Sequence, residues 1–237
     1  MNTQEEIRGP NHPYDELIVQ GPILAGFAVT GFGVYDRLKT FAQAIDKDGV
    51  HLSTIAPLVL MLAAIWLGLG WYTAAKQELR IINRHLGEFL PQNDFTGLPF
   101  IAILALTLVT MAYFSNQPLL FCGSLLIYQI LGLTAQYMVR SEAKKTLPRA
   151  SDAKVAPDVI QSLTRYYVNR PYGYASWSAL LLSCIAVLVL VLSATALPAF
   201  IGGNRAIIAQ ILSVVVIFGS EGVMWKYRYR LYRQLSG

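Results

Sequence analysis

The sequence predicts an all-α integral membrane protein, with six transmembrane helices in three consecutive hairpins and short amphipathic helices on the cytoplasmic side. Composition is the first observation: the 237 residues are 54% hydrophobic and 14% charged, whereas soluble domains carry about 25% charged residues. The second is a series of six apolar segments near the length of about 20 residues that a helix needs to cross a bilayer. The third is that short connections join the third segment to the fourth and the fifth to the sixth.

The six apolar segments differ in their strength as candidate spans. The first is the weakest, because it contains Gln20, Pro22 and four glycines. If this segment does not span, the chain has five crossings and an external N-terminus. The six segments are residues 17–35, 54–75, 98–114, 118–139, 174–200 and 206–225.

The lengths of the connections predict the hairpins. Only residues 115–117 separate the third and fourth segments, and so short a gap forces a tight antiparallel turn. Residues 201–205 (IGGNR) are expected to form the turn between the fifth and sixth segments. The longer connection between the first and second segments, residues 36–53, has room for a short amphipathic helix from Leu38 to Ile45.

The distribution of basic residues predicts the orientation, because cytoplasmic loops carry an excess of Lys and Arg. The side that holds both termini and the segments after the second and fourth spans has 15 of the 19 Lys and Arg residues, and the other side has 4. Both termini are therefore expected in the cytoplasm, with the protein in an inner or plasma membrane.

The chain is expected to divide into four regions. These are a polar cytoplasmic N-terminus (1–16), four spans (17–139), a cytoplasmic linker with an amphipathic helix (140–173), and a last hairpin with a basic tail (174–237).

Two cytoplasmic stretches have helical patterns. Residues 78–89 form either a separate amphipathic helix or a continuation of the second span. Residues 157–168 begin at Pro157, which suits the first turn of a helix. The tyrosine pair and the basic flanks of this second stretch favour a helix on the membrane surface, and packing against another cytoplasmic helix is the alternative. The predicted membrane-surface anchors are Tyr166, Tyr167, Trp225, Lys226, Tyr227 and Arg228.

Glu221 is the one acidic residue within a predicted span. A carboxylate in a bilayer is energetically costly, and is a functional candidate for that reason. Its position four residues before Trp225 puts it about 6 Å inside the interfacial aromatic belt. Two interpretations remain open: an ion- or proton-binding group, or a structural partner of Lys226 or of a basic residue in a neighbouring hairpin.

Polar amides and small residues inside the spans predict helix contacts. The amides either form hydrogen bonds across helices or line a polar pore, and they are Gln129, Gln136 and Gln210. Small residues allow helices to approach closely, within one chain or between copies. The small residues in question are Gly26, Gly31, Ala64, Gly68, Gly70 and Ala74.

Motifs for catalysis, metal binding and cofactor binding are absent from the sequence. Cys122 and Cys184 each lie inside an apolar run, and there are too few cysteines for a zinc site. The three histidines lie outside the spans, which argues against a transmembrane haem protein. The sequence has no phosphate loop, HExxH or GxSxG motif. We therefore predict no catalytic residue, no metal, no cofactor and no nucleic-acid partner.

Three classes of function remain. The favoured class is a non-enzymatic homo-oligomeric channel, pore or membrane-permeabilising protein, which fits the small size, the small-residue faces and the few buried polar groups. The second is an accessory or assembly subunit of a larger membrane complex, with the basic cytoplasmic surface as its docking site. The third is an enzyme that modifies lipid. The expected partners are anionic lipid headgroups, and either further copies of the chain or other membrane subunits.

Overall fold

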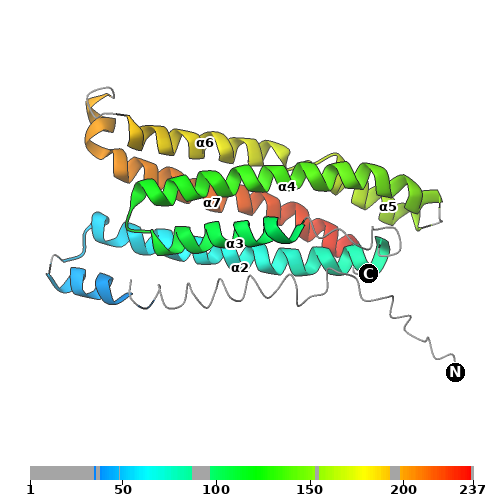
Figure 1. Ribbon diagram of the computed structural model, residues 1–237, viewed down its shortest axis with the longest axis horizontal. Helices are drawn as coiled ribbons and strands as arrows, with labels where there is room; N and C mark the ends of the chain where they lie inside the picture. The colour runs from blue at the N-terminus through cyan, green and yellow to red at the C-terminus, as the bar shows by residue number, and fades with distance from the viewer. Residues whose placement is uncertain are drawn as a thin grey trace.

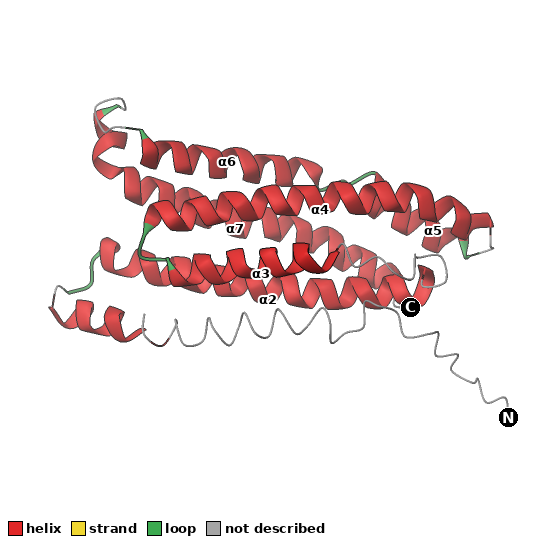
Figure 2. Ribbon diagram, in the orientation of Figure 1, coloured by secondary structure: helices red, strands yellow, loops and turns green. Residues whose placement is uncertain are grey.

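The computed structural model describes residues 35, 38–47, 49–86, 97–152, 155–192 and 198–235. Within these ranges the chain forms helices and turns, with no strand, and the long helices lie side by side in one elongated bundle (Figures 1 and 2). The all-α class is therefore confirmed. Residues 17–34 lie outside the described residues, so the six-helix count stays a prediction. Three stretches are long and apolar enough to cross a membrane: Pro118–Asp152, Pro157–Val191 and Asn204–Leu235.

Five long helices close a ring. α2 packs against α3, α3 against α4, α4 against α6, α6 against α7, and α7 against α2, while α4 and α7 also touch each other. Figure 1 shows α5 beside the far end of α4. The bounds are α2 Leu52–Leu86, α3 Gly97–Tyr113, α4 Pro118–Asp152, α5 Pro157–Leu163, the π-helical turn η2 Thr164–Val168, α6 Gly173–Val191 and α7 Ala199–Leu235.

Short local signals explain where the helices begin. The predicted tight turn between the third and fourth segments is present: the Gln117 amide donates to the Phe114 carbonyl at 2.9 Å, and α4 starts at Pro118. α5 starts at Pro157, as predicted. Proline suits both positions, because its missing N–H would have no partner within the first turn. The short helix expected before α2 is present at residues 38–47.

The predicted turn at residues 201–205 is wrong, because these residues lie inside α7. The Pro198 carbonyl accepts hydrogen bonds from the amides of Ile201 and Gly202, at 2.8 and 2.9 Å. The first turn of the helix thus forms before the paired glycines, and these then continue it.

Three helices continue past their apolar parts, and their extensions lie at the same end of the bundle (Figure 1). α2 continues to Leu86, so residues 78–86 extend the second span, which is one of the two alternatives. α4 has 35 residues and α7 has 37, which makes each longer than 50 Å at about 1.5 Å per residue. A bilayer core is only about 30 Å thick, so both helices are longer than a bilayer core. The basic stretches that follow their apolar parts lie at one shared end of the bundle (Figure 1).

Apolar side chains fill the centre of the ring. Phe121, Leu125 and Ile217 are completely buried, together with leucines of α2 and small residues of α6. The five helices therefore pack on one another instead of enclosing an open lumen.

The small residues of α2 contribute to packing within the chain. Ala64 belongs to the central core, and Gly68 is buried. A Cβ atom at Gly70 would lie 3.4 Å from Nε1 of Trp225 on α7. Gly26 and Gly31 lie outside the described residues, and the side chain of Ala74 is not among those described.

Candidate functional site

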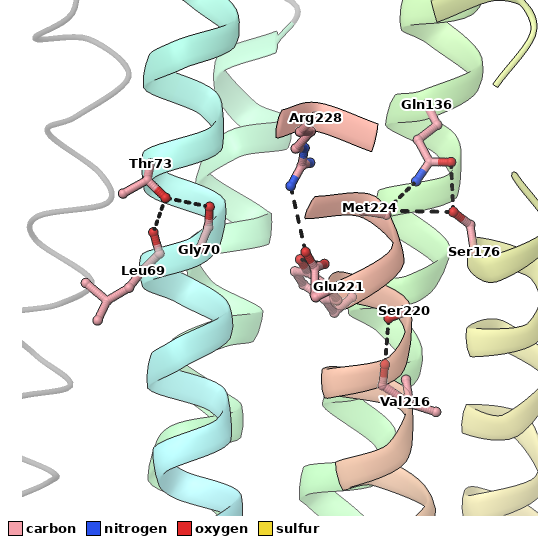
Figure 3. A network of polar contacts seen from close by, with 11 residues as sticks. Leu69, Gly70, Thr73, Gln136, Ser176, Val216, Ser220, Glu221, Met224 and Arg228 are labelled. Atoms are coloured by element: carbon pink, nitrogen blue, oxygen red, sulfur yellow. Dashed lines mark hydrogen bonds and ion pairs between the residues drawn. The ribbon is translucent and has the colours of Figure 1, made fainter. Parts of the chain in front are cut away.

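The candidate site centres on the carboxylate of Glu221, which α7 places against α4 with only 5% of the residue exposed. Its Oε1 accepts a hydrogen bond from the Tyr128 hydroxyl of α4 at 3.4 Å. Its Oε2 lies 3.7 Å from Nη1 of Arg228, as Figure 3 shows. A carboxylate, a phenol and a guanidinium thus meet inside the bundle.

Arg228, and not Lys226, is the basic partner of Glu221 on α7. At 100° per residue, a position seven residues on lies on nearly the same helix face, whereas one five residues on lies near the opposite face. Accordingly Lys226 is exposed, while Arg228 is 9% exposed. The prediction of Arg228 as a membrane-surface anchor disagrees with this burial, because the side chain points into the bundle.

A second polar group surrounds the Gln136 amide of α4. Its Oε1 accepts hydrogen bonds from the Ser176 hydroxyl of α6, at 3.1 Å, and from Nη2 of Arg170. Its Nε2 lies 3.7 Å from the Met224 sulfur. Figure 3 shows Gln136, Ser176 and Met224 converging from three helices. Arg170 lies in the turn between η2 and α6, and no sequence pattern predicts its role.

The two polar groups form one layer of the bundle. On α7, Glu221, Met224 and Arg228 follow one another at spacings of three and four residues, so they share one face. On α4, Tyr128 and Gln136 are eight residues apart, which is about 12 Å along the helix. The two groups together therefore extend over about that depth of the bundle. We call these seven residues the polar layer: Tyr128, Gln136, Arg170, Ser176, Glu221, Met224 and Arg228.

The other two predicted amides, Gln129 and Gln210, differ in their position relative to this layer. Gln129 is buried on α4, and Gln210 is half-buried on α7, eleven residues before Glu221. That separation is about 16 Å along the helix. Of the four predicted ion or proton candidates, Glu221 and Gln136 thus belong to the polar layer, Gln129 lies next to Tyr128 along α4, and Gln210 lies about three turns of α7 away.

The tyrosine pair of the predicted surface helix is buried within the protein. Tyr166 and Tyr167 meet edge to face, with ring centroids 4.9 Å apart. They pack with residues of α4 and α7 in what we call the end cluster. This packing corresponds to the alternative in which the helix contacts other helices, because side chains covered by protein cannot anchor in lipid. The end cluster comprises Leu147, Ala150, Leu163, Tyr166, Tyr167, Tyr172, Leu231 and Leu235.

The remaining predicted anchors have mixed environments. Trp225 is half-buried, and its indole nitrogen faces Gly70 of α2. Tyr227 is half-buried against the end cluster. Lys226 is exposed, so it is the one of these three that is free to reach headgroups.

The described residues contain no group of three or more His, Cys, Asp or Glu side chains that could hold a metal ion. Comparisons with protein-family models, curated proteins and solved structures gave no match. The geometry of the polar layer and of the bundle is therefore the basis for a functional hypothesis.

Proposed function

We propose that this chain is a multi-pass membrane protein that works without enzymatic chemistry, as a homo-oligomeric channel or pore for small ions or protons. The observation that carries the proposal is the buried Glu221 carboxylate, held with Tyr128 and Arg228 inside helices that can cross a bilayer. Ionisable groups are rare at such depths and commonly mark ion or proton paths.

The structure of the bundle suggests how such a path would run. The polar layer lies toward the basic end, and the amides and hydroxyls around Gln136 extend it. Beyond it the ring is closed by apolar side chains such as Phe121 and Ile217. A path across the whole bilayer would therefore continue between copies of the chain, which supports a homo-oligomer.

A flux measurement tests this proposal. Purified protein in liposomes should dissipate an imposed proton or potassium gradient, and Glu221→Gln should reduce that flux at least about tenfold, because it removes the buried charge while keeping its shape. Glu142→Gln is the matched control, because Glu142 lies on the exposed face of α4 in an ion pair with Lys145. Wild-type flux in a well-folded Glu221→Gln protein would remove the carboxylate from the path.

The orientation belongs to the same proposal: both termini face the cytoplasm, with the basic extensions on that side. Reporter fusions at Gly237 and at Asn116, which lies in the turn before α4, should then report opposite sides, with the Gly237 fusion cytoplasmic. Fusions that report the same side would contradict the orientation and the number of crossings after Asn116.

An accessory or assembly subunit is the second candidate, and one observation favours it. Arg228 and Tyr128 already neutralise and hydrogen-bond the Glu221 carboxylate within one chain, as expected for a purely structural ion pair. Purification in mild detergent followed by mass measurement separates the two candidates. One closed homo-oligomer supports a pore, whereas stoichiometric foreign subunits support an accessory role.

A further inference from the structure

Two arginines at the basic end of α4 and α6 have buried guanidinium nitrogens that lack an acceptor. Arg170 is 8% exposed, and its Nε has no hydrogen-bond partner among the described residues. The Nε of Arg140, a half-buried residue on α4, also has no hydrogen-bond partner among the described residues. Buried donors of this kind are uncommon, and each calls for an explanation such as an unobserved ligand.

Arg170 contacts the turn of α4 that precedes Arg140. Arg170 donates to Gln136, and its guanidinium lies 4.8 Å from the ring centroid of Tyr137. Arg140 follows these two residues by four and three positions on the same helix, so it occupies the next turn of the same face. Arg140 and the α4 residues that Arg170 contacts are therefore about one helical turn apart.

The described side-chain contacts of Arg170 are with neutral groups. Arg170 faces the Gln136 amide oxygen and the rings of Tyr137 and Tyr172. The Glu221 carboxylate is engaged by Arg228, and Glu142 pairs with Lys145 on the exposed face of α4. Burial of a guanidinium without an anion is unfavourable, so the buried Arg170, with the Nε of Arg140 beside the same helix face, calls for an anionic ligand.

The backbone also holds Arg170 in an unusual conformation, with a φ of 47°. Side chains other than glycine rarely adopt positive φ values. The conformation turns the arginine back onto α4 immediately before α6 begins. The residue with this unfavourable backbone geometry is thus the one whose guanidinium contacts Gln136.

The level of the two arginines indicates the source of the anion. Arg140 directly follows the apolar part of α4, and Arg170 precedes α6 by three residues, so both lie where the bundle would leave the bilayer. Exposed aromatic side chains lie at the same level: Tyr137 on α4, and Tyr174 and Trp177 on α6. Aromatic residues of this kind collect at the headgroup level of membranes.

We propose that Arg140 and Arg170 bind the phosphate group of an anionic phospholipid at the edge between α4 and α6. The planar guanidinium matches the geometry of a phosphate and can donate two hydrogen bonds to it. Basic pockets between transmembrane helices bind anionic headgroups in this way. The site requires that α4 and α6 cross a membrane, and it is independent of whether the protein conducts ions.

Native mass spectrometry of the full chain in a neutral detergent tests the site. After addition of phosphatidylglycerol or phosphatidylcholine, the wild-type protein should retain phosphatidylglycerol preferentially. Arg140→Gln should weaken that retention about ten- to hundredfold, which corresponds to the loss of hydrogen bonds between charged groups. Arg149→Gln is the matched control, because Arg149 is an exposed arginine farther along α4, and it should retain the lipid like the wild type.

A second arm separates lipid from soluble phosphate. Inorganic phosphate is added to delipidated protein, and the shift in melting temperature is compared between the wild type and Arg140→Gln. One outcome is a phosphate-dependent shift that Arg140→Gln removes, in a protein that does not retain phosphatidylglycerol selectively. That outcome would show that the site binds phosphate and that its ligand is a soluble anion, not a lipid. Arg140→Gln and Arg149→Gln behaving alike in both arms would overturn the proposal. Arg140 carries the test because Arg170, held at positive φ, could be required for folding.

Discussion

Replacing Arg228 with alanine is expected to destabilise the folded protein by about 3–5 kcal/mol, the range found when one member of a buried ion pair is removed. The Glu221 carboxylate would remain inside the bundle without the guanidinium that now lies 3.7 Å from it. Glu221→Ala should have an effect of similar size, because it leaves Arg228 buried in the same way. Both variants can be compared with the wild type by denaturant or thermal unfolding in one detergent.

Two controls identify the buried pair as the cause of this loss. Lys145→Ala breaks the exposed ion pair with Glu142 and should change stability by only about 0–1 kcal/mol. The double variant Glu221→Leu/Arg228→Met removes both buried charges, and it should recover most of the stability, because apolar replacements of buried pairs are often neutral or favourable. If Arg228→Ala lowers stability no more than Lys145→Ala does, the ion pair of Arg228 and Glu221 is solvated and does not stabilise the fold.

The double variant also relates stability to function. If Glu221 serves only as a structural partner, the stable double variant should behave like the wild type in every transport measurement. If the carboxylate lies on an ion path, the double variant should fold and yet conduct poorly. This combination separates the two interpretations of Glu221 without relying on an unstable protein.

The helical class could be predicted from the sequence because hydropathy and turn length act locally. An apolar run of about 20 residues has few alternatives to a helix in a membrane, and a proline suits the first turn of a helix, as at Pro118 and Pro157. The α6–α7 turn was misplaced because paired glycines resemble a turn signal, whereas Pro198 starts the helix before them.

The partners within the polar layer depend on tertiary packing, which the sequence shows only in part. The spacing of seven residues between Glu221 and Arg228 was a usable signal. The position of Arg228 beyond Trp225, however, predicts contact with the headgroups. Arg170 had no such signal, because its contact with Gln136 joins positions 34 residues apart through the packing of α4 against the segment before α6. Likewise an amphipathic pattern in residues 157–168 predicts an apolar face, but not whether lipid or protein covers it.

Leu163→Ala is the second substitution with a large expected effect, and it tests what covers that face. Leu163 is completely buried at the end of α5, within the end cluster that joins this segment to α4 and α7. Loss of a buried leucine typically costs about 2–5 kcal/mol. Because α5 and η2 are short, we expect this loss to appear as local opening of residues 155–168, while the long helices stay folded.

Hydrogen exchange on the full chain, in detergent without anionic lipid, measures this opening directly. The wild-type segment should be protected under these conditions, since protein contacts hold it, and Leu163→Ala should remove the protection. Gln161→Ala, at an exposed position of the same helix, should leave this protection intact.

A segment held by the membrane surface would behave differently. It would exchange rapidly in the wild type and gain protection when anionic lipid is added. It would lose that protection at high salt, because surface attraction is screened over about 10 Å at 0.1 M. The burial of Tyr166 and Tyr167 against α4 and α7 favours the first pattern, in which the apolar face of residues 157–168 is covered by the chain's own helices.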